Sequence, residues 1–125
     1  MKQEPFSPAK RIRSFKYAFQ GISALMREEH NFRIHLVLLA AVVIAGFSFR
    51  ISAGEWCLCL LCFGMVLMAE AMNSAIEALS DLVMPDPHPL IKKAKDVAAA
   101  GVLLTAIAAA AVGLIIFLPY IWNRI

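Results

Sequence analysis

Three long stretches of this chain are rich in apolar residues, and most of the polar residues lie between them or near their ends. The stretches cover residues 34–50, 56–84 and 90–122, and no charged residue occurs from residue 97 to residue 122. A helix needs about 20 residues to cross the hydrocarbon core of a bilayer. The third stretch meets this requirement easily, while the first two meet it only if polar residues near one end are tolerated. The pattern predicts three transmembrane helices.

The segment before the first stretch has a different pattern. Apolar residues recur there every three or four positions, with basic and amide side chains between them; the apolar positions are Ile12, Phe15, Phe19, Ile22 and Met26. This spacing predicts an amphipathic helix over about residues 9–33. A helix packed on a soluble core would show the same spacing. The membrane span that follows at once favours a helix lying on the membrane surface.

The connections are short and polar. Residues 52–55 form the turn between the first two spans, and residues 84–89 read Met-Pro-Asp-Pro-His-Pro. Three prolines cannot lie inside a helix, because each lacks an N–H donor and clashes with the preceding turn. Pro89 suits the first turn of the next helix. We therefore expect one all-α integral membrane domain over residues 1–125, with a surface helix followed by three transmembrane helices.

Composition and charge agree with this architecture. The chain is 61% hydrophobic and 17% charged, with a formal net charge of +3. A soluble domain is closer to half apolar and a quarter charged. Lys and Arg concentrate in the N-terminal segment and at residues 92–95, so the positive-inside rule predicts that both face the cytoplasm. Basic residues that flank membrane spans argue against nucleic-acid binding, and no cleavable signal peptide is apparent.

A polar stripe runs along the second span. At about 100° per residue, Glu70, Asn73, Glu77 and Asp81 fall within an arc of roughly 80°, with Ser74 beside them. An ionised carboxylate inside a bilayer costs at least about 2.5 kcal/mol. The stripe must therefore face a cation, a water-filled cleft or another subunit.

The chemistry of these groups suits phosphoryl transfer. Carboxylates and phosphates are the usual ligands of protein-bound Mg²⁺, and the lysines of residues 92–95, predicted to lie at the same membrane level, suit phosphate. A further carboxylate can take a proton from a hydroxyl nucleophile. The glycine-rich motifs of P-loop enzymes and protein kinases are absent from the sequence.

Two other interpretations of the stripe remain open on spacing alone. The carboxylates could make polar contacts that hold helices or subunits together, or they could line a path for ions or protons.

Two further features of the sequence are less informative about function. Cys57, Cys59 and Cys62 lie in an apolar run without nearby histidines, so we interpret them as apolar filler rather than zinc ligands. His35, at the start of the first span, is expected to be an interfacial hydrogen-bonding anchor.

The motifs in these segments resemble the prokaryotic diacylglycerol kinase family, which includes undecaprenol kinases. The resemblance rests on Glu-Ala-Met-Asn-Ser-Ala-Ile-Glu at residues 70–77 with Asp81, His-Pro-Leu at residues 88–90, and Ala-Lys-Asp at residues 94–96. It implies a homotrimer in the bacterial inner membrane, with active sites near the subunit interfaces at the cytoplasmic face. It also implies transfer of the γ-phosphate of ATP to a lipid hydroxyl.

The resemblance assigns roles to individual residues. Glu70 would be the general base, and Glu29 and Glu77 would hold Mg²⁺. The ATP site would comprise Tyr17, Glu29, Glu77, Lys95 and Asp96, with support from Asn73, Ser74 and Asp81. The lipid is expected to be undecaprenol, with diacylglycerol as the alternative. Diacylglycerol-specific members often carry Phe-Arg-Gln-Glu where this chain has Phe-Arg-Ile-His at residues 32–35, and Ala98-Ala99 replaces their Gly-Ser.

Overall fold

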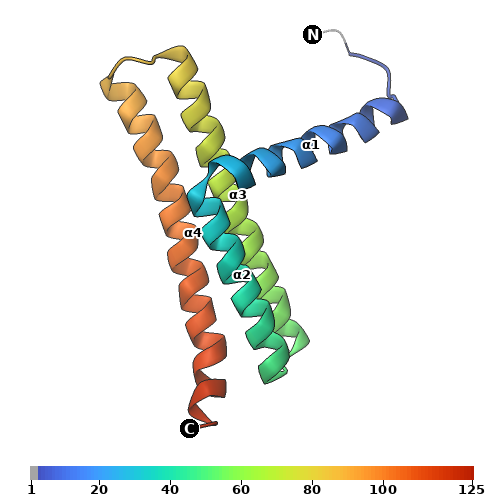
Figure 1. Ribbon diagram of the computed structural model, residues 1–125, viewed down its shortest axis with the longest axis vertical. Coiled ribbons are helices and arrows are strands. Elements are labelled where there is room, and N and C mark those ends of the chain that lie inside the picture. Colours follow the sequence, from blue (N-terminus) through green and yellow to red (C-terminus); the bar gives the residue numbers. More distant parts are fainter. Residues whose placement is uncertain (1–2) are drawn as a thin grey trace.

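The computed structural model describes residues 3–125, which form four helices and no strand. The helices are α1 (Pro8–Glu28), α2 (His30–Phe49), α3 (Ala53–Val83) and α4 (Pro89–Trp122) (Figure 1). Residues 1 and 2 of the predicted domain lie outside the described part. The all-α fold predicted from the sequence is confirmed, and the three spans begin and end within a few residues of their predicted limits.

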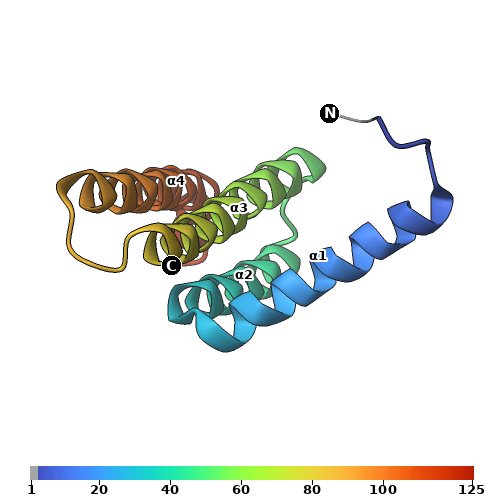
Figure 2. The ribbon, with the colours of Figure 1, turned by 90° about the horizontal axis from the view of Figure 1, so that it is seen from above.

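Helices α2, α3 and α4 run along one another, and α3 packs against both of its neighbours. Helix α1 leaves this bundle at a steep angle and extends away from it (Figure 1, Figure 2). This is the arrangement expected when α1 lies along a membrane surface and the other three helices cross the membrane.

The predicted limits of the surface helix were wrong at its C-terminal end. The sequence predicted one helix to residue 33, but α1 ends at Glu28 and α2 begins at His30. Glu29 has extended backbone angles (φ −110°, ψ 109°), which let the chain change direction between the two helices. No proline or glycine marks this position. At this break the Glu29 side chain contacts α3, as described below.

The turn between α2 and α3 is tightly specified. Arg50 adopts a left-handed conformation (φ 53°), and the Ile51 N–H donates to the Gly46 carbonyl at 3.1 Å, as in a Schellman motif. Ser52 and Glu55 then form a capping box: the Glu55 N–H donates to Ser52 Oγ at 3.2 Å, and the Ser52 N–H donates to Glu55 Oε1 at 2.9 Å. This local chemistry fixes where α2 stops and α3 starts.

The main buried cluster lies at the same end of the bundle. Ile51, Cys59 and Ile116 are its buried members, and Phe49 and Tyr120 pack around them. Tyr120 also donates a hydrogen bond to the Glu55 carboxylate at 2.6 Å. The contacts join α3, α4 and the end of α2 into one unit. Cys59 is thus apolar filler, as expected.

Gly46 is required by the close approach of α2 and α3. A Cβ atom at this position would lie 2.5 Å from the Trp56 ring. We expect Gly46→Ala to lower the free energy of unfolding by about 1–3 kcal/mol, because the rigid indole cannot yield without disturbing its neighbours. The control is Gly64→Ala on α3, where nothing lies within 4 Å of an added Cβ. Unfolding in detergent should separate the two variants, and equal stability would contradict the steric argument.

The long helices expose most of their apolar surface. Each of α2, α3 and α4 is long and apolar enough to cross a membrane, yet only 11%, 17% and 6% of the most apolar window of each helix is buried within the chain. The remaining surface must face lipid or other subunits. The chain is therefore a multi-pass membrane protein, as predicted.

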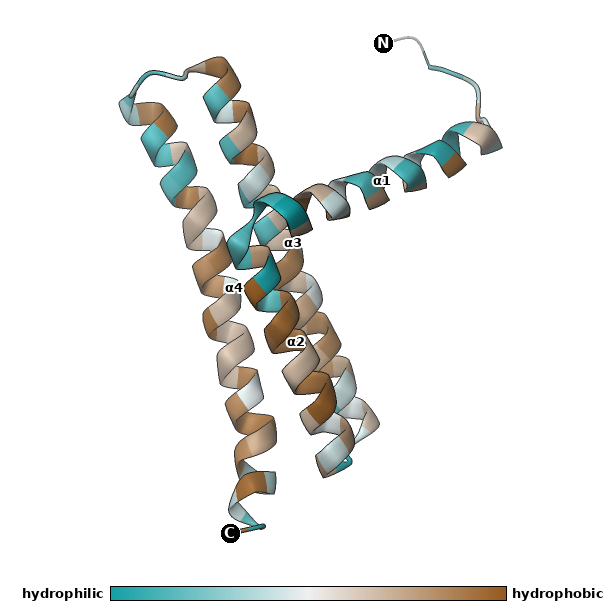
Figure 3. Ribbon diagram, viewed as in Figure 1, coloured by the Kyte–Doolittle hydropathy of each residue, from teal (hydrophilic) through white to brown (hydrophobic). Residues whose placement is uncertain are grey.

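Helices α3 and α4 continue past the level at which α1 joins α2 (Figure 1). The junction meets α3 at Ser74, and the nine residues from there to Val83 add about 13 Å of helix. Polar residues are concentrated in these extensions and along α1, whereas the opposite half of the bundle is mostly apolar (Figure 3). The charged ends of α3 and α4 therefore extend beyond the α1–α2 junction.

Candidate active site

The break between α1 and α2 brings Glu29 onto the polar stripe of α3. Ser74 Oγ donates a hydrogen bond to Glu29 Oε1 at 2.6 Å, across 45 residues of sequence. Because Glu29 lies outside both helices, its side chain is free to point toward α3. The structure thus brings together two residues that the sequence had placed in the site from separate segments.

The next contact along the stripe joins Asn73 and Glu77. Asn73 Nδ2 donates to Glu77 Oε1 at 3.2 Å, so the amide oxygen points elsewhere. That oxygen, Oδ1, is buried and has no hydrogen-bond partner in residues 3–125. A buried acceptor without a donor is costly, and a cation or a ligand hydroxyl would satisfy it.

These oxygens fit a Mg²⁺ site that is completed by the substrate. Glu29, Glu77 and Asn73 supply oxygen atoms, and magnesium commonly takes only one or two protein carboxylates together with phosphate oxygens and water. Within the described residues, no three His, Cys, Asp or Glu side chains gather closely enough to form a metal cage by themselves. The donor set therefore suits a metal that arrives with a nucleotide.

Glu70 is the buried carboxylate of the stripe. It is only 3% exposed, and its Oε1 atom has no hydrogen-bond partner within the described chain. The Nε2 atom of the His35 ring on α2 lies 3.2 Å from Oε1, but the two atoms do not form a hydrogen bond. The position of His35 at the start of the span predicts an interfacial anchor, and it does not predict this contact with Glu70. The available signal was an ionisable side chain inside an apolar span.

Two ion pairs lie in the parts of α3 and α4 that extend beyond the α1–α2 junction. Lys95 Nζ lies 2.6 Å from Asp81 Oδ1 and links the two helices, while Lys92 Nζ lies 2.5 Å from Asp96 Oδ2 on α4. Three of these four side chains are well exposed, and Lys95 is partly exposed. Solvated pairs of this kind contribute little to stability, so a charged ligand can exchange partners with them at small cost.

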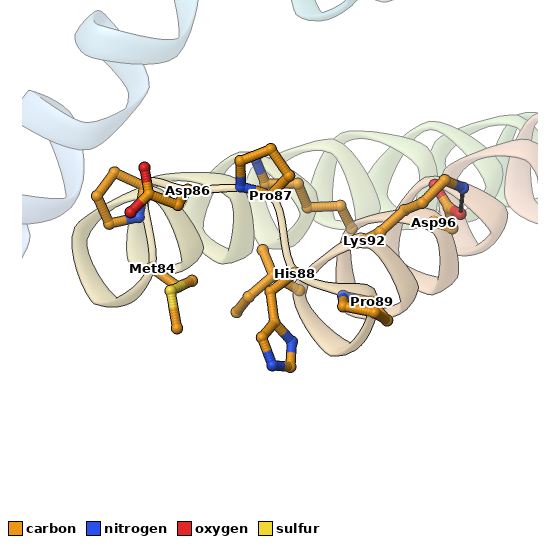
Figure 4. A pocket seen from close by; sticks show the side chains of 10 residues that line it. Met84, Asp86, Pro87, His88, Pro89, Lys92 and Asp96 are labelled. Atoms are coloured by element: carbon orange, nitrogen blue, oxygen red, sulfur yellow. Dashed lines mark hydrogen bonds and ion pairs between the residues drawn. The ribbon is translucent and has the colours of Figure 1, made fainter.

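A hollow of about 620 Å³ lies beside these ion pairs. The proline-rich loop forms one side of it, and Lys92, Lys95 and Asp96 of α4 form the other (Figure 4). His88 lies in this loop, where its Nδ1 atom accepts a hydrogen bond from the Leu90 N–H at 3.1 Å and caps α4. No site residue was predicted in this loop, although its proximity in sequence to residues 92–96 was a usable signal.

Tyr17 is the one candidate residue that the chain does not bring to the others. It is 63% exposed on α1, and it does not line the hollow beside the proline-rich loop, the hollow between α1 and α3 or the hollow at the start of α2. The remaining candidates lie along the C-terminal half of α3, in the facing part of α4, at the α1–α2 junction and beside the proline-rich loop.

Comparison with known proteins identifies the family. Residues 16–117 match the family model described as prokaryotic diacylglycerol kinase. The chain belongs to this family. Its candidate site residues from Tyr17 to Asp96 all lie within the matched range.

Relatives within the prokaryotic diacylglycerol kinase family carry two different names. The undecaprenol kinase of Bacillus subtilis is 41% identical over 108 residues, which cover 86% of this chain and 88% of that protein. The diacylglycerol kinase of Pseudomonas aeruginosa is 43% identical over 94 residues, covering 73% and 76%. The diacylglycerol kinase of Synechocystis is 39% identical over 107 residues, covering 85% and 61%.

Family membership confirms the predicted activity class. The protein is a membrane lipid kinase, a phosphotransferase that acts on an alcohol group. ATP is the co-substrate that a kinase family implies. A lipid kinase activity is the function class predicted from the sequence, in preference to ion transport or a non-catalytic assembly.

Proposed function

We propose that this protein is an undecaprenol kinase that uses MgATP at the cytoplasmic face of a bacterial inner membrane. The observation that carries the mechanism is Glu70, a carboxylate that is 3% exposed in a membrane helix and has an oxygen without a hydrogen-bond partner. The lipid assignment is supported by the similarity to the Bacillus subtilis undecaprenol kinase along 86% of the chain. It is also supported by Phe-Arg-Ile-His at residues 32–35.

Glu70 is suited to activate a lipid hydroxyl. A buried carboxylate gains a donor when a hydroxyl approaches it, and removal of that proton makes the hydroxyl oxygen a better nucleophile. Glu70 lies one turn closer to the membrane interior than Ser74, the point at which the α1–α2 junction touches α3. A lipid alcohol anchored by its chain in the bilayer would present its hydroxyl at about this depth, whereas a soluble alcohol would not.

The neighbouring residues would hold the metal and the phosphates. Glu29, Glu77 and the orphaned Asn73 oxygen would bind Mg²⁺, which supplies neutralisation of phosphate charge when it is bound. Ser74 and the Asn73 amide fix the two carboxylates by the hydrogen bonds described above. Positioning and charge neutralisation account for most of the catalysis of phosphoryl transfer.

The hollow beside the proline-rich loop would take the nucleotide. Lys95 offers an ammonium group to phosphate oxygens, and Asp81 and Asp96 hold the surrounding positive charges in place. The long helices leave most of their apolar surface uncovered, which supports a homotrimer. In that assembly Tyr17 would stack on the adenine ring, and the N-terminus would face the cytoplasm.

Lys95→Gln is expected to weaken ATP binding. The glutamine keeps a hydrogen-bond donor but loses the positive charge. Because hydrogen bonds between charged groups contribute more binding free energy than neutral ones, their loss should raise the KM for ATP by roughly 10–100-fold. The control is Lys93→Gln, because Lys93 does not line the hollow. Steady-state kinetics at saturating Mg²⁺ and lipid measure the effect. Equal KM values for the two variants would remove Lys95 from the nucleotide site.

The lipid is tested by transfer of labelled γ-phosphate from MgATP in mixed micelles, with undecaprenol and diacylglycerol offered separately at equal mole fraction. We expect label on undecaprenol. Label mainly on diacylglycerol would make the protein a diacylglycerol kinase and overturn the lipid assignment. Label on neither lipid, with protein shown to be folded and assembled, would contradict the proposed activity.

A further inference from the structure

His35 and Glu70 face each other across the contact between α2 and α3. Their side chains are 15% and 4% exposed, so both are largely removed from solvent. On one side of this contact, residues 36–49 of α2 and residues 56–69 of α3 carry no charged side chain. An ionisable side chain inside a membrane span is costly without a partner. The pairing of two such side chains therefore requires a structural or functional explanation.

The Glu70 carboxylate has a single basic neighbour among the described residues. Within residues 3–125, His35 is the only group that comes within ion-pair distance of the Glu70 carboxylate. The other polar residues of the stripe are engaged elsewhere: Ser74 donates to Glu29, and the Asn73 amide donates to Glu77. The orientation of Glu70 therefore depends on one contact with α2.

The contact is close but not yet a hydrogen bond. His35 Nε2 lies 3.2 Å from Glu70 Oε1, and that oxygen has no aligned donor. Catalytic hydrogen bonds are often long or poorly aligned before the substrate is bound, and they tighten in the working complex. A small rotation of either side chain would align Nε2–H with the carboxylate.

We propose that His35 is the positioning residue of Glu70. Its Nε2–H donates to Oε1, which fixes the carboxylate and leaves Oε2 directed to the lipid hydroxyl. The hydroxyl proton passes to Oε2, the lipid oxygen bonds to the γ-phosphorus, and the bond from that phosphorus to the β–γ bridging oxygen breaks, releasing ADP. His35 keeps its proton throughout. This inference rests on the proposed role of Glu70 and adds a second residue to it.

Three substitutions separate positioning from packing. Glutamine can place its amide N–H near the position of histidine Nε2, asparagine has the same chemistry but a shorter reach, and leucine fills the space without a donor. We expect His35→Gln to keep kcat within about threefold of wild type. His35→Asn and His35→Leu should lower kcat by roughly 10–100-fold, the effect of losing one hydrogen bond to a charged group. The KM for ATP should stay within about twofold in all three variants, because His35 does not touch the nucleotide hollow.

Thermal unfolding and assembly in detergent are measured on every variant, so that a loss of fold is not mistaken for a loss of catalysis. If the leucine variant fails to assemble, the glutamine and asparagine pair decides, since both are polar and close in size. Equal kcat in these two variants, or wild-type kcat in a folded leucine variant, overturns the proposal. Glu70→Gln is assayed in parallel. Full activity there would refute the role of Glu70 itself, whereas an inactive Glu70→Gln beside a fully active His35→Leu would refute only the role of His35.

Discussion

Glu70→Gln should abolish phosphoryl transfer while leaving the helical fold in place. The glutamine has almost the same shape and can still contact His35, but its amide cannot accept the proton of a lipid hydroxyl. Loss of a general base typically lowers the rate by about 10²–10⁴-fold. Stability should be unchanged or higher, because a neutral amide is less costly than a carboxylate at a site that is 3% exposed.

The assay is transfer of labelled γ-phosphate from MgATP to the preferred lipid in mixed micelles. The matched control is Glu55→Gln, which makes the same chemical change on the same helix at the opposite end of the bundle. Glu55 caps α3 and accepts a hydrogen bond from Tyr120, and a glutamine oxygen can replace it in both contacts. A Glu70→Gln enzyme with full turnover would exclude Glu70 as the base.

Local sequence patterns were sufficient to predict the helices and the stripe. Hydropathy identifies α2, α3 and α4 because each must be apolar over about 20 residues to cross a bilayer. The helical period alone places Asn73 and Glu77 on one face, one turn apart, and their hydrogen bond follows from that spacing. The proline-rich loop and the capping box are likewise recognisable within a few residues of sequence.

Contacts between distant segments could not be predicted in the same way. The helix break at Glu29 carries no proline or glycine, and the Glu29 side chain accepts a hydrogen bond there from a serine 45 residues away. The pairing of His35 with Glu70 depends on how α2 rotates against α3, which no local period determines. Tyr17 was assigned to the ATP site only by the family resemblance, and within one chain it does not lie beside the other candidate residues.

The positions of these residues along the helix axes relate the contacts to the proposed function. The α1–α2 junction meets α3 at Ser74, so Glu70 lies one turn to one side of that level and Asp81 lies two turns to the other. In the proposed orientation, the Glu70 side is the membrane side. One polar stripe can therefore meet a lipid hydroxyl at its inner end and a water-soluble nucleotide at its outer end. A kinase that joins these two substrates needs such a path, about three helical turns long from Glu70 to Asp81.

Glu77→Gln should raise the Mg²⁺ concentration needed for half-maximal activity. Glu77 lies between the proposed base and the nucleotide hollow along the stripe, and its Oε1 atom is held by the Asn73 amide at 3.2 Å. Glutamine keeps one oxygen but removes the charge that binds a divalent cation. Loss of a residue that only supports a ligand costs about 10–100-fold in metal affinity, so loss of a charged ligand should raise the requirement by at least about tenfold or stop turnover.

A Mg²⁺ titration at fixed ATP and lipid measures this shift, with Glu55→Gln again as the control because it lies at the far end of α3. The metal assignment predicts that high Mg²⁺ restores part of the activity of Glu77→Gln but none of the activity of Glu70→Gln, since only Glu77 is proposed to bind the metal. An unchanged Mg²⁺ dependence in Glu77→Gln would remove Glu77 from the metal site and leave Glu29 and Asn73 as the remaining protein ligands. Equal rescue of both variants would instead indicate that the stripe responds to Mg²⁺ as a whole, without separate roles for base and ligand.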